Sequence, residues 1–518
     1  MIRTEVLKAI EKNPDFDVVI IGGGASGIGI ALDSVLRGYR TLLVEKSDFT
    51  KGTSSRSTKL VHGGVRYLAQ GNVKLVAEAL RERGYLRKNA PHLVKNQEFI
   101  IPNYRWWEGI FYTIGLTLYD LMAGGFSFGK SRHLSLSKTK SDLPGIKEKG
   151  LKGGVLYHDG QFDDSRLAID ILHAVFDKGG FAINYFEATG ILKNSDGKVS
   201  GITATDQTSS KSFEIQAKVV FNATGVWVDD ILKLDHPETG KLVVPSQGVH
   251  LILDKKFHPG PYALMIPKTE DGRVLFAVPW IGHVLVGTTD TPLDYALDEP
   301  IALNKEVDFI LKTAGLYFKH RPKKKDVKSV FAGLRPLAAP KYEGSKTKEI
   351  SRSHKILVSE SKLITITGGK WTTYRKIAED AVDIAIQNSL LKNSPCSTKN
   401  FRISELSQLP DEYLFVYGVR SKQIHNLIIE NPKLGIKFHN DLPYTPAEVI
   451  WICRNEMVNK LEDMLSRRLR ALFLDAKISQ SIAKDVAVLM GKELFWTDEK
   501  IKSEVENFKS LANNYILS

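Results

Sequence analysis

The chain has 518 residues, of which 42% are hydrophobic and 25% are charged, values typical of a globular protein with about two to four domains. The formal net charge of +13 favours an anionic partner, such as a phosphorylated small molecule, an anionic lipid or a nucleic acid. The basic residues are scattered, however, and the densest run, residues 321–328, is expected to be a solvated loop. Because no nucleic-acid-binding motif accompanies this run, the sequence argues against a nucleic-acid partner.

The sequence has no pattern of a disulfide-rich or membrane-spanning protein. Its two cysteines, Cys396 and Cys453, fit no disulfide framework or metal site and are expected to be buried thiols. Residues 1–17 are charged and lack the apolar core of a secretory signal. The longest uncharged apolar stretch, Gly109–Tyr119, is shorter than the about 20 residues that a spanning helix needs. We therefore expect a cytoplasmic protein, and peripheral attachment to the inner face of the cytoplasmic membrane stays open.

The first predicted elements form a β-α-β unit. Residues 16–21 (FDVVII) are a continuous apolar run, typical of a strand buried on both faces of a parallel sheet. An apolar helix over 25–37 and a second buried strand over 41–45 follow.

The rest of the chain alternates strands and helices before it becomes helical. The sequence predicts a loop over 50–64, helices over 72–89 and 167–178, short strands over 182–217, and buried strands over 218–222 and 362–367. Residues 242–286 are typical of a mostly antiparallel sheet, and residues 91–150 are mixed. After about residue 390 helical periodicity dominates. One apolar stripe consists of Val458, Leu461, Leu465, Leu469 and Leu472.

The segment between the first strand and the first helix carries a dinucleotide-binding motif. Gly22 to Gly27 match G-x-G-x-x-G directly after a buried strand and at the start of a helix, the context that gives this motif its meaning. Gly22 permits the tight turn, Gly24 lets a pyrophosphate approach the backbone with Ala25 and Ser26, and Gly27 lets the helix pack on the strand. Glu45 ends the second strand, where a carboxylate accepts hydrogen bonds from ribose and disfavours NADP.

Three later segments favour FAD over NAD. The run from Thr53 to Ser57 offers hydroxyl donors to a pyrophosphate from a second side. The run VVFNATG, which ends at Thr224–Gly225, is typical of a late strand that returns beside the adenosine. Residues 368–373 (GGKWTT) start a helix whose N-terminal N–H groups could stabilise negative charge on a reduced flavin.

Several motifs occur in an order that resembles the FAD-dependent glycerol-3-phosphate dehydrogenase family, within the D-amino-acid-oxidase-like flavoproteins. They are TSSRSTKLVHGGVRYL (53–68), DGQFDDSRL (159–167), VGTTDTP (286–292), AGLRPL (332–337), SRSH (351–354), GGKWTTYRKIAE (368–379) and EMVNKLEDMLSRRLRALFLDA (456–476). The resemblance covers nearly the whole chain. It departs at Trp371, where the family often has a small aliphatic residue, and at Arg56, where it often has Ser or Ala.

The resemblance implies a fold and a division into domains. The expected class is α/β (α+β overall), with a Rossmann-like FAD-binding domain, an antiparallel-sheet substrate domain and a helical C-terminal cap domain. The corresponding residues are 1–90 with 151–235 and 355–395, then 91–150 with 236–354, and then 396–518. The cofactor contacts that we expect are Gly22, Gly24, Ala25, Ser26, Gly27, Glu45, Thr53, Ser54, Ser55, Ser57, His62, Gly63, Gly64, Thr224, Gly225, Gly369, Lys370, Trp371 and Thr372.

The resemblance also implies oxidation of sn-glycerol-3-phosphate to dihydroxyacetone phosphate, with hydride transfer from C2 to flavin N5. The electrons are expected to pass to a membrane quinone. Some members use oxygen, but those are longer than this chain and have an insertion. A homodimer is compatible with this expectation.

Such a reaction needs cations for the phosphate, a base for the hydroxyl proton and a positive group near the reacting oxygen. By resemblance, Arg335 lies near flavin and substrate, and Arg66, Tyr67, Arg352 and Lys370 bind the substrate. His250 is the favoured base, with a structural histidine as the alternative; His62 is expected to be structural or beside the flavin, and Thr289–Asp290 to close a turn.

Two alternatives remain open at this point. The same fold carries oxidases that act on amines or 2-hydroxy acids, and one carboxylate could use two of the cations. A non-catalytic RNA- or membrane-binding protein that keeps a flavin fold is also compatible with the net charge.

Overall fold

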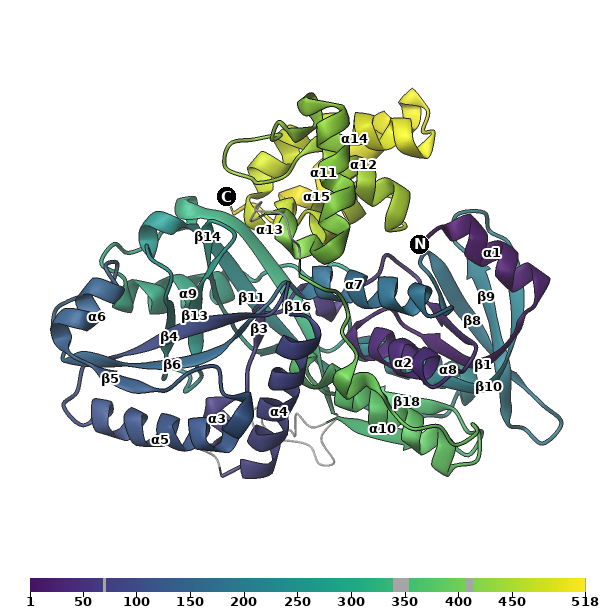
Figure 1. Cartoon of the computed structure of the whole chain (residues 1–518), viewed down its shortest axis with the longest axis horizontal. Helices are drawn as coiled ribbons and strands as arrows, with labels where there is room; N and C mark the ends of the chain where they lie inside the picture. The colour runs from purple at the N-terminus through teal and green to yellow at the C-terminus, as the bar shows by residue number, and fades with distance from the viewer. Residues whose placement is uncertain (69–70, 339–353, 407–412, 518) are drawn as a thin grey trace.

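The computed structural model describes residues 1–68, 71–338, 354–406 and 413–517. It contains two β-sheets side by side and a helical C-terminal domain that lies over the junction between them (Figure 1). One sheet carries the glycine motif, and the other carries His250 in β11 and Arg335 in β16, the two residues expected to be catalytic. No helix within these described ranges is long and apolar enough to span a bilayer.

The first sheet has the order β17(Lys355–Val358)-β18(Ile364–Thr367)-β10(Ser212–Asn222)-β1(Asp15–Ile21)-β2(Thr41–Val44)-β7(Phe181–Ile183). Its central strands from β18 to β7 run parallel, and β8(Phe186–Lys193) and β9(Val199–Asp206) form an antiparallel extension of β10. Val18, Val19 and Ile20 are fully buried because α2(Ala25–Leu36), α7(Asp164–Asp177) and α10(Tyr374–Gln387) cover this part of the sheet. The predicted β-α-β unit is confirmed.

The second sheet has the order β15(Thr291–Pro292)-β11(Val243–Asp254)-β14(His283–Gly287)-β13(Leu275–Trp280)-β12(Ala263–Ile266)-β4(Lys95–Asn103)-β6(Gly153–Gln161)-β3(Leu60–Val61). β16(Val327–Ala338) pairs with β11, and β5(Arg132–Leu134) pairs with β6. Apart from the parallel pair β12–β4, the sheet is antiparallel, as the sequence predicts. α9(Asn304–Tyr317) packs against β11 and β14.

Strand β6 links the two expected domains. The sequence-based division places residues 151–235 with the FAD-binding segments, whereas β6 pairs with β4 along its whole length in the second sheet. The chain returns to the first domain only at α7, whose N-terminus is capped by the Asp163 carboxylate accepting from the Arg166 N–H. Residues 91–150, for which the sequence predicts only mixed secondary structure, form β4, α5(Glu108–Ala123), β5 and α6(Leu136–Asp142). The helices α3(Val65–Leu68) and α4(Val73–Asn89) adjoin α5.

The C-terminal domain is helical, as predicted. It contains α11(Ser421–Glu430), α12(Pro446–Asn455), a π-helical turn η10(Asp463–Arg468), α13(Ala471–Leu474), α14(Ala476–Leu494) and α15(Asp498–Asn513). All five residues of the apolar stripe are buried, but they do not lie on one helix, because Arg470 has φ +64° and separates η10 from α13. The remaining helices are α1(Arg3–Lys12) and α8(Val228–Asp235). Cys396 and Cys453 are free thiols, but they are half-buried, so the expectation of full burial was wrong.

Two glycine-to-alanine changes should alter stability in opposite directions. A Cβ at Gly27 would lie 2.0 Å from the Gly22 carbonyl oxygen, so we expect Gly27→Ala to destabilise the fold by about 1–3 kcal/mol. Gly115 lies in α5 with nothing within 4 Å of such a Cβ, so Gly115→Ala should stabilise by up to about 1 kcal/mol. Thermal unfolding of both variants checks this, and equal shifts of the midpoint would contradict it.

Candidate cofactor and substrate site

A cavity of about 770 Å³ is lined by segments of both sheets. Its walls come from the β1–α2 turn, residues 44–58, the end of β10, strands β11, β13 and β16, and residues 368–372. Such a volume is typical of sites for large organic ligands. The expected cofactor contacts that line it are Gly22, Gly24, Ala25, Ser26, Glu45, Thr53, Ser54, Ser57, His62, Gly64, Thr224, Gly225, Gly369, Lys370, Trp371 and Thr372.

The glycine turn brings backbone close to backbone. Gly22 has φ +112°, and a Cβ there would lie 2.7 Å from the Ala223 carbonyl oxygen at the end of β10. Gly24 is the N-cap of α2 and lines the cavity, and Gly27 lies behind the turn. The N-terminal N–H groups of α2 therefore lie beside the cavity, where the helix dipole favours an anion such as a pyrophosphate.

Glu45 closes one end of the cavity. Its carboxylate accepts hydrogen bonds from the Gly23 N–H at 2.7 Å and the Ser47 N–H at 2.9 Å. Burial raises the pKa of the Glu45 carboxyl, and these two backbone donors oppose the rise. The carboxylate thus ties the glycine turn after β1 to the chain that follows β2. It also lies at the position where the sequence predicts a ribose contact.

The hydroxyl-rich loop packs directly against the glycine turn. The Ala25 N–H donates to Ser54 Oγ at 2.9 Å, and the Trp371 indole N–H donates to the Ser54 carbonyl oxygen at 2.8 Å. Trp371 therefore connects the flavin-side segment 368–373 to the loop, which explains a large residue where the family often has a small one. Ser55 is buried beneath the cavity wall instead of lining it.

Arg56, the other departure from the family pattern, has its charge balanced by an acidic partner. Its guanidinium donates to both Glu299 carboxylate oxygens at 2.9 and 2.8 Å and to the Ala332 carbonyl oxygen at 3.0 Å. The carboxylate and the nearby Tyr515 hydroxyl raise the pKa of Arg56 above its ordinary value despite burial. Arg56 therefore adds little net positive charge to the cavity wall.

His250 lies in β11 with a buried imidazole. Its Nε2 is 2.9 Å from Thr58 Oγ1, and its ring stacks on Phe331 with centroids 5.0 Å apart. Burial, together with the positive charges of Arg335 and Lys59, lowers the pKa of His250 well below its ordinary 6.5. The imidazole is therefore neutral at pH 7, the state that can accept a proton.

Arg335 reaches the same cavity from β16. Its Nη1 donates to the Thr289 carbonyl oxygen and its Nη2 to Thr288 Oγ1, both at 3.1 Å, and Nη1 lies 3.5 Å from the Asp290 carboxylate. A Cβ at Gly248 would lie 2.3 Å from Nη2, so a glycine is needed for the guanidinium to cross β11. Lys370 lines the cavity at the N-terminus of the 371–373 turn. The cavity thus combines cationic side chains with a neutral imidazole.

The remaining expected site residues are Gly63, Arg66, Tyr67 and Arg352. The Gly63 N–H donates to the Tyr119 hydroxyl at 2.8 Å, and Gly63 lies behind the cavity wall. Arg66 and Tyr67 belong to α3, whose backbone alone is described at these two positions. Arg352 lies outside the residues that the structure describes.

Sequence reasoning missed several cavity residues. Thr58, Trp227 and Arg273 line the cavity, although no motif-based argument had singled them out. Thr58 lies inside the motif at 53–68, and its neighbours Ser57 and Lys59 gave the only available signal. Arg273 lies in a turn before β13, and only the fold shows that it lines the same cavity as His62.

Comparisons with known proteins agree with this geometry. The family described as FAD dependent oxidoreductase matches residues 17–375, and the C-terminal domain of alpha-glycerophosphate oxidase matches residues 360–501. Mitochondrial glycerol-3-phosphate dehydrogenase of Macaca fascicularis is 37% identical over 98% of this chain and 74% of its own length. The Saccharomyces cerevisiae protein of the same description is 35% identical over 97% of this chain and 90% of its own length.

This chain belongs to the FAD-dependent glycerol-3-phosphate dehydrogenase family. The solved structure of glycerol-3-phosphate dehydrogenase from Bacillus halodurans, in complex with FAD, superposes with a TM-score of 0.80 at 29% identity, and covers 99% of this chain and 98% of that one. The family, the fold class and the FAD dependence predicted from the sequence are therefore confirmed. The backbone cradle at Gly22 and Gly24, beside the N-terminus of α2, fits the pyrophosphate of that cofactor.

Proposed function

We propose that this protein oxidises sn-glycerol-3-phosphate to dihydroxyacetone phosphate. The observation that carries the proposal is the presence of a neutral, buried His250 in the same cavity as Arg335 and Lys370, in a chain of this family. Bound FAD would supply the hydride acceptor, N5 of the flavin. The protein's own groups must hold the phosphate, orient C2 and accept the hydroxyl proton.

The binding and charge-stabilising tasks are assigned to different side chains. Arg335 is held by Thr288 and Thr289, so its guanidinium is preorganised to stabilise negative charge on the reacting oxygen. We assign Lys370, Arg66, Tyr67 and Arg352 to the substrate, chiefly its phosphate. Arg273 adds a further cation to the described wall of the cavity.

His250 is the proposed base. Because burial and neighbouring cations keep it neutral, it can take the C2 hydroxyl proton as hydride leaves. The hydrogen bond between His250 Nε2 and Thr58 Oγ1, together with stacking on Phe331, fixes the ring. Thr58 is therefore proposed as the residue that positions the base.

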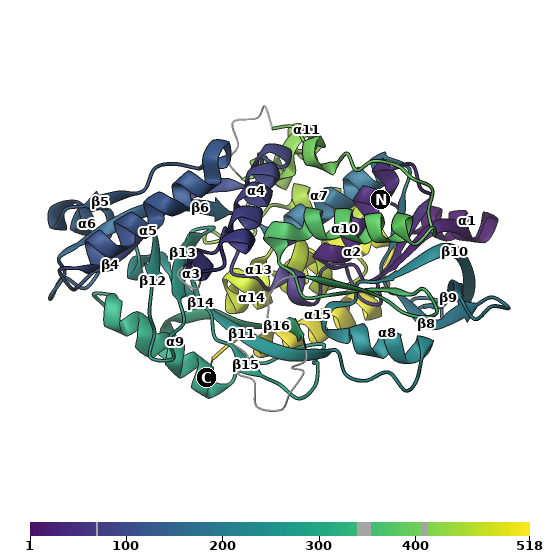
Figure 2. The same cartoon turned by 90° about the horizontal axis from the view of Figure 1, so that it is seen from below.

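We propose a membrane quinone as the electron acceptor, with the protein docked peripherally through α5. This helix lies along the edge of the molecule opposite the C-terminal domain and packs alongside β5 and β6 (Figures 1 and 2). Its outer face exposes large apolar side chains, among them Ile110 (62%), Ile114 (67%) and Leu121 (73%). Arg105 precedes the helix, and Lys130 and Arg132 follow it, all exposed, as suits an anionic lipid surface.

The inner face of α5 connects this surface to the cavity. The Tyr119 hydroxyl donates to the Asp159 carboxylate at 2.8 Å and accepts from the Gly63 N–H. Asp159 lines the cavity, as does Val65, which packs in the apolar cluster around Leu116. A quinone that leaves the membrane at α5 would therefore approach the cofactor through the part of the cavity wall that contains His62, Gly64 and Val65.

We also propose the domain division given by the sequence, with one change. Residues 1–90, 151–235 and 355–395 form the FAD-binding domain, residues 91–150 and 236–354 the substrate domain, and residues 396–518 the cap domain. Strand β6 is reassigned to the substrate domain because it pairs with β4.

The proposed reaction is tested by mixing the purified protein with sn-glycerol-3-phosphate under anaerobic conditions while the visible spectrum is recorded. We expect the flavin absorption band to bleach within the mixing experiment and to return when a quinone analogue is added. Glycine and lactate serve as comparison substrates and should leave the spectrum unchanged. Bleaching by either of these, and not by glycerol-3-phosphate, would replace the proposal by an amine or 2-hydroxy-acid oxidase.

The base is tested by the pH dependence of kcat/KM. Because the pKa of His250 lies well below 6.5, the imidazole stays neutral as the pH falls to 6.5, so kcat/KM should decline only at lower pH. We expect His250→Asn to lower kcat by about 10²–10⁴-fold. Thr58→Val should lower it by up to about tenfold, and Thr58→Ser should restore it. A wild-type acid limb above pH 6.5, or a His250→Asn variant with normal kcat, contradicts the assignment.

Membrane docking is tested by sedimentation with vesicles that contain anionic lipid. We expect the double variant Ile114→Glu, Leu121→Glu to lower binding about tenfold or more, since each buried side chain of this size contributes about 1.5–3 kcal/mol. Turnover with a soluble acceptor should not change. Phe495→Glu, at a still more exposed apolar residue of the C-terminal domain, is the control and should bind normally. Unchanged vesicle binding with loss of a dimer would make this face a subunit interface instead.

A further inference from the structure

We propose that the C-terminal helical domain is a functional part of the cofactor site, because its η10 turn and Arg470 hold the loop 46–57 in the conformation that encloses FAD. This inference rests on FAD dependence and not on the identity of the substrate. Residues of this loop form the cavity wall beside the glycine turn, among them Lys46, Ser47, Thr50, Lys51 and Thr53. Within the loop itself, regular structure is limited to the turn η1(Thr53–Ser55), so its shape must come from outside contacts.

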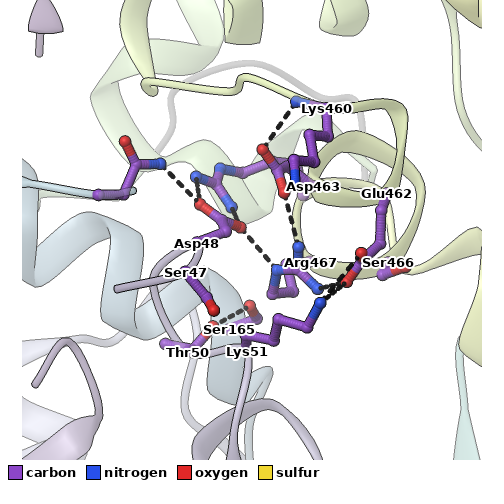
Figure 3. A network of polar contacts seen from close by, with 12 residues as sticks. Ser47, Asp48, Thr50, Lys51, Ser165, Lys460, Glu462, Asp463, Ser466 and Arg467 are labelled. Carbon is purple, nitrogen blue, oxygen red and sulfur yellow. Dashed lines mark hydrogen bonds and ion pairs between the residues drawn. The ribbon is translucent and has the colours of Figure 1, made fainter. Parts of the chain in front are cut away.

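The first contact is a buried carboxylate with two arginines. Asp48 is completely buried, and its carboxylate accepts from Arg467 Nε at 2.6 Å and from both Arg468 Nη atoms at 3.0 Å. A fourth donor is Asn184 Nδ2 at 3.1 Å. The two arginines lower the pKa of Asp48 to about 2 despite burial, so it is ionised at neutral pH. Figure 3 shows Asp48 and Arg467 at the centre of this network.

The second contact extends the network to the cavity wall itself. Lys51 Nζ lies 3.1 Å from the Glu462 carboxylate, and that carboxylate accepts from Arg467 Nη1 at 2.8 Å (Figure 3). Arg467 Nη2 donates to Asp463 at 2.7 Å. The Arg467 side chain thus joins the Asp48 carboxylate of the loop to the carboxylates of Asp463 in η10 and of Glu462, which precedes η10. Lys51 joins the loop to the same Glu462 carboxylate.

The third contact holds the far end of the loop. Arg470 Nη2 donates to the Ser55 carbonyl oxygen at 2.8 Å and to the Asp164 carboxylate at 3.1 Å. Asp164 in turn accepts from Ser57 Oγ and from Lys59 Nζ, both at 2.6 Å. The left-handed conformation of Arg470 ends η10 and directs the following chain into α13.

These contacts have consequences for cofactor binding because their charges are buried and mutually compensating. Removal of one partner leaves an uncompensated charge that the interior tolerates poorly, so the local structure must shift until water reaches it. The loop 46–57 has little regular structure of its own, and its displacement opens the cavity wall beside the glycine turn. The expected result is faster release of FAD, with little effect on how a retained cofactor reacts.

The test measures the rate of flavin release from the purified, full-length holoenzyme, followed by the rise in free-flavin fluorescence after dilution. We expect Asp48→Asn to accelerate release at least about tenfold, equivalent to about 1.4 kcal/mol, and Lys51→Met, at a less buried residue, to accelerate it by a smaller factor. With saturating FAD, the KM of Asp48→Asn for glycerol-3-phosphate should return to the wild-type value, because Asp48 does not line the cavity.

Glu448→Gln is the matched control. Glu448 is buried in the same domain, where it accepts from the Tyr417 hydroxyl at 2.9 Å and caps α12 through Thr445, away from the loop. It should lower the midpoint of thermal unfolding without accelerating flavin release. The proposal is overturned if both loop variants release FAD at the wild-type rate, or if Glu448→Gln accelerates release as much as Asp48→Asn at an equal loss of thermal stability. A wild-type protein that retains FAD but is not reduced by glycerol-3-phosphate would refute the proposed substrate and leave this inference standing.

Discussion

The close approach of backbone segments at the glycine turn is the constraint on which the rest of the site depends. Strand β1 can end against β10 only because Gly22 has no side chain to meet Ala223, and α2 can start there only because Gly27 fits beneath the Gly22 carbonyl. This places the N-terminus of α2 at the carboxyl ends of parallel strands, where ligands of α/β folds bind. Two neighbouring parts of the cavity wall are tied to that turn: Glu45 accepts a hydrogen bond from the Gly23 N–H, and Ser54 accepts one from the Ala25 N–H.

Charge in this molecule is arranged so that buried cations have defined acidic or carbonyl partners, while the proposed base stays neutral. Arg56 is neutralised by Glu299, and Asp48 by Arg467 and Arg468. Arg335 is oriented by neutral oxygen atoms of Thr288 and Thr289, with Asp290 at a longer distance. It therefore keeps positive charge to direct at an anion and, with burial, keeps the pKa of His250 low. The arginine proposed to stabilise the reacting oxygen thus also helps to keep the imidazole unprotonated.

The sequence was most informative where the chemistry is local. The glycine motif, its flanking strands and Glu45 lie within 30 residues, and each restricts the backbone directly, so their placement could be predicted. Motif order across the chain supplied the family, and with it Arg335, Lys370 and His250. Periodicity could not assign β6 to a sheet, because each of its residues pairs with a β4 residue far away in the sequence. The nearest such pair is Asn103 with Gly153. The stripe from Val458 to Leu472 predicted burial correctly but could not reveal the π-helical turn or the bend at Arg470.

Contacts between distant segments were beyond reach for a physical reason. Asp48 and Arg468 are 420 positions apart, and Thr58 and His250 are 192 apart. No local preference of either residue encodes the partner, because the ion pair can form only after packing has brought the two segments of the chain together. The exposed apolar face of α5 was visible in the sequence only as an uncharged run, since exposure is a property of the folded helix.

The central claim is that one cavity holds the cofactor along the glycine turn and the substrate between Arg335, Lys370 and His250. It is tested most directly by a crystal structure of the protein with FAD and a non-reactive analogue of glycerol-3-phosphate. The account predicts the pyrophosphate at the N-terminus of α2, the flavin ring beside residues 369–372, and the analogue's hydroxyl within hydrogen-bonding distance of His250. A flavin ring at the Glu45 end, or an analogue bound away from His250 and Arg335, would contradict it.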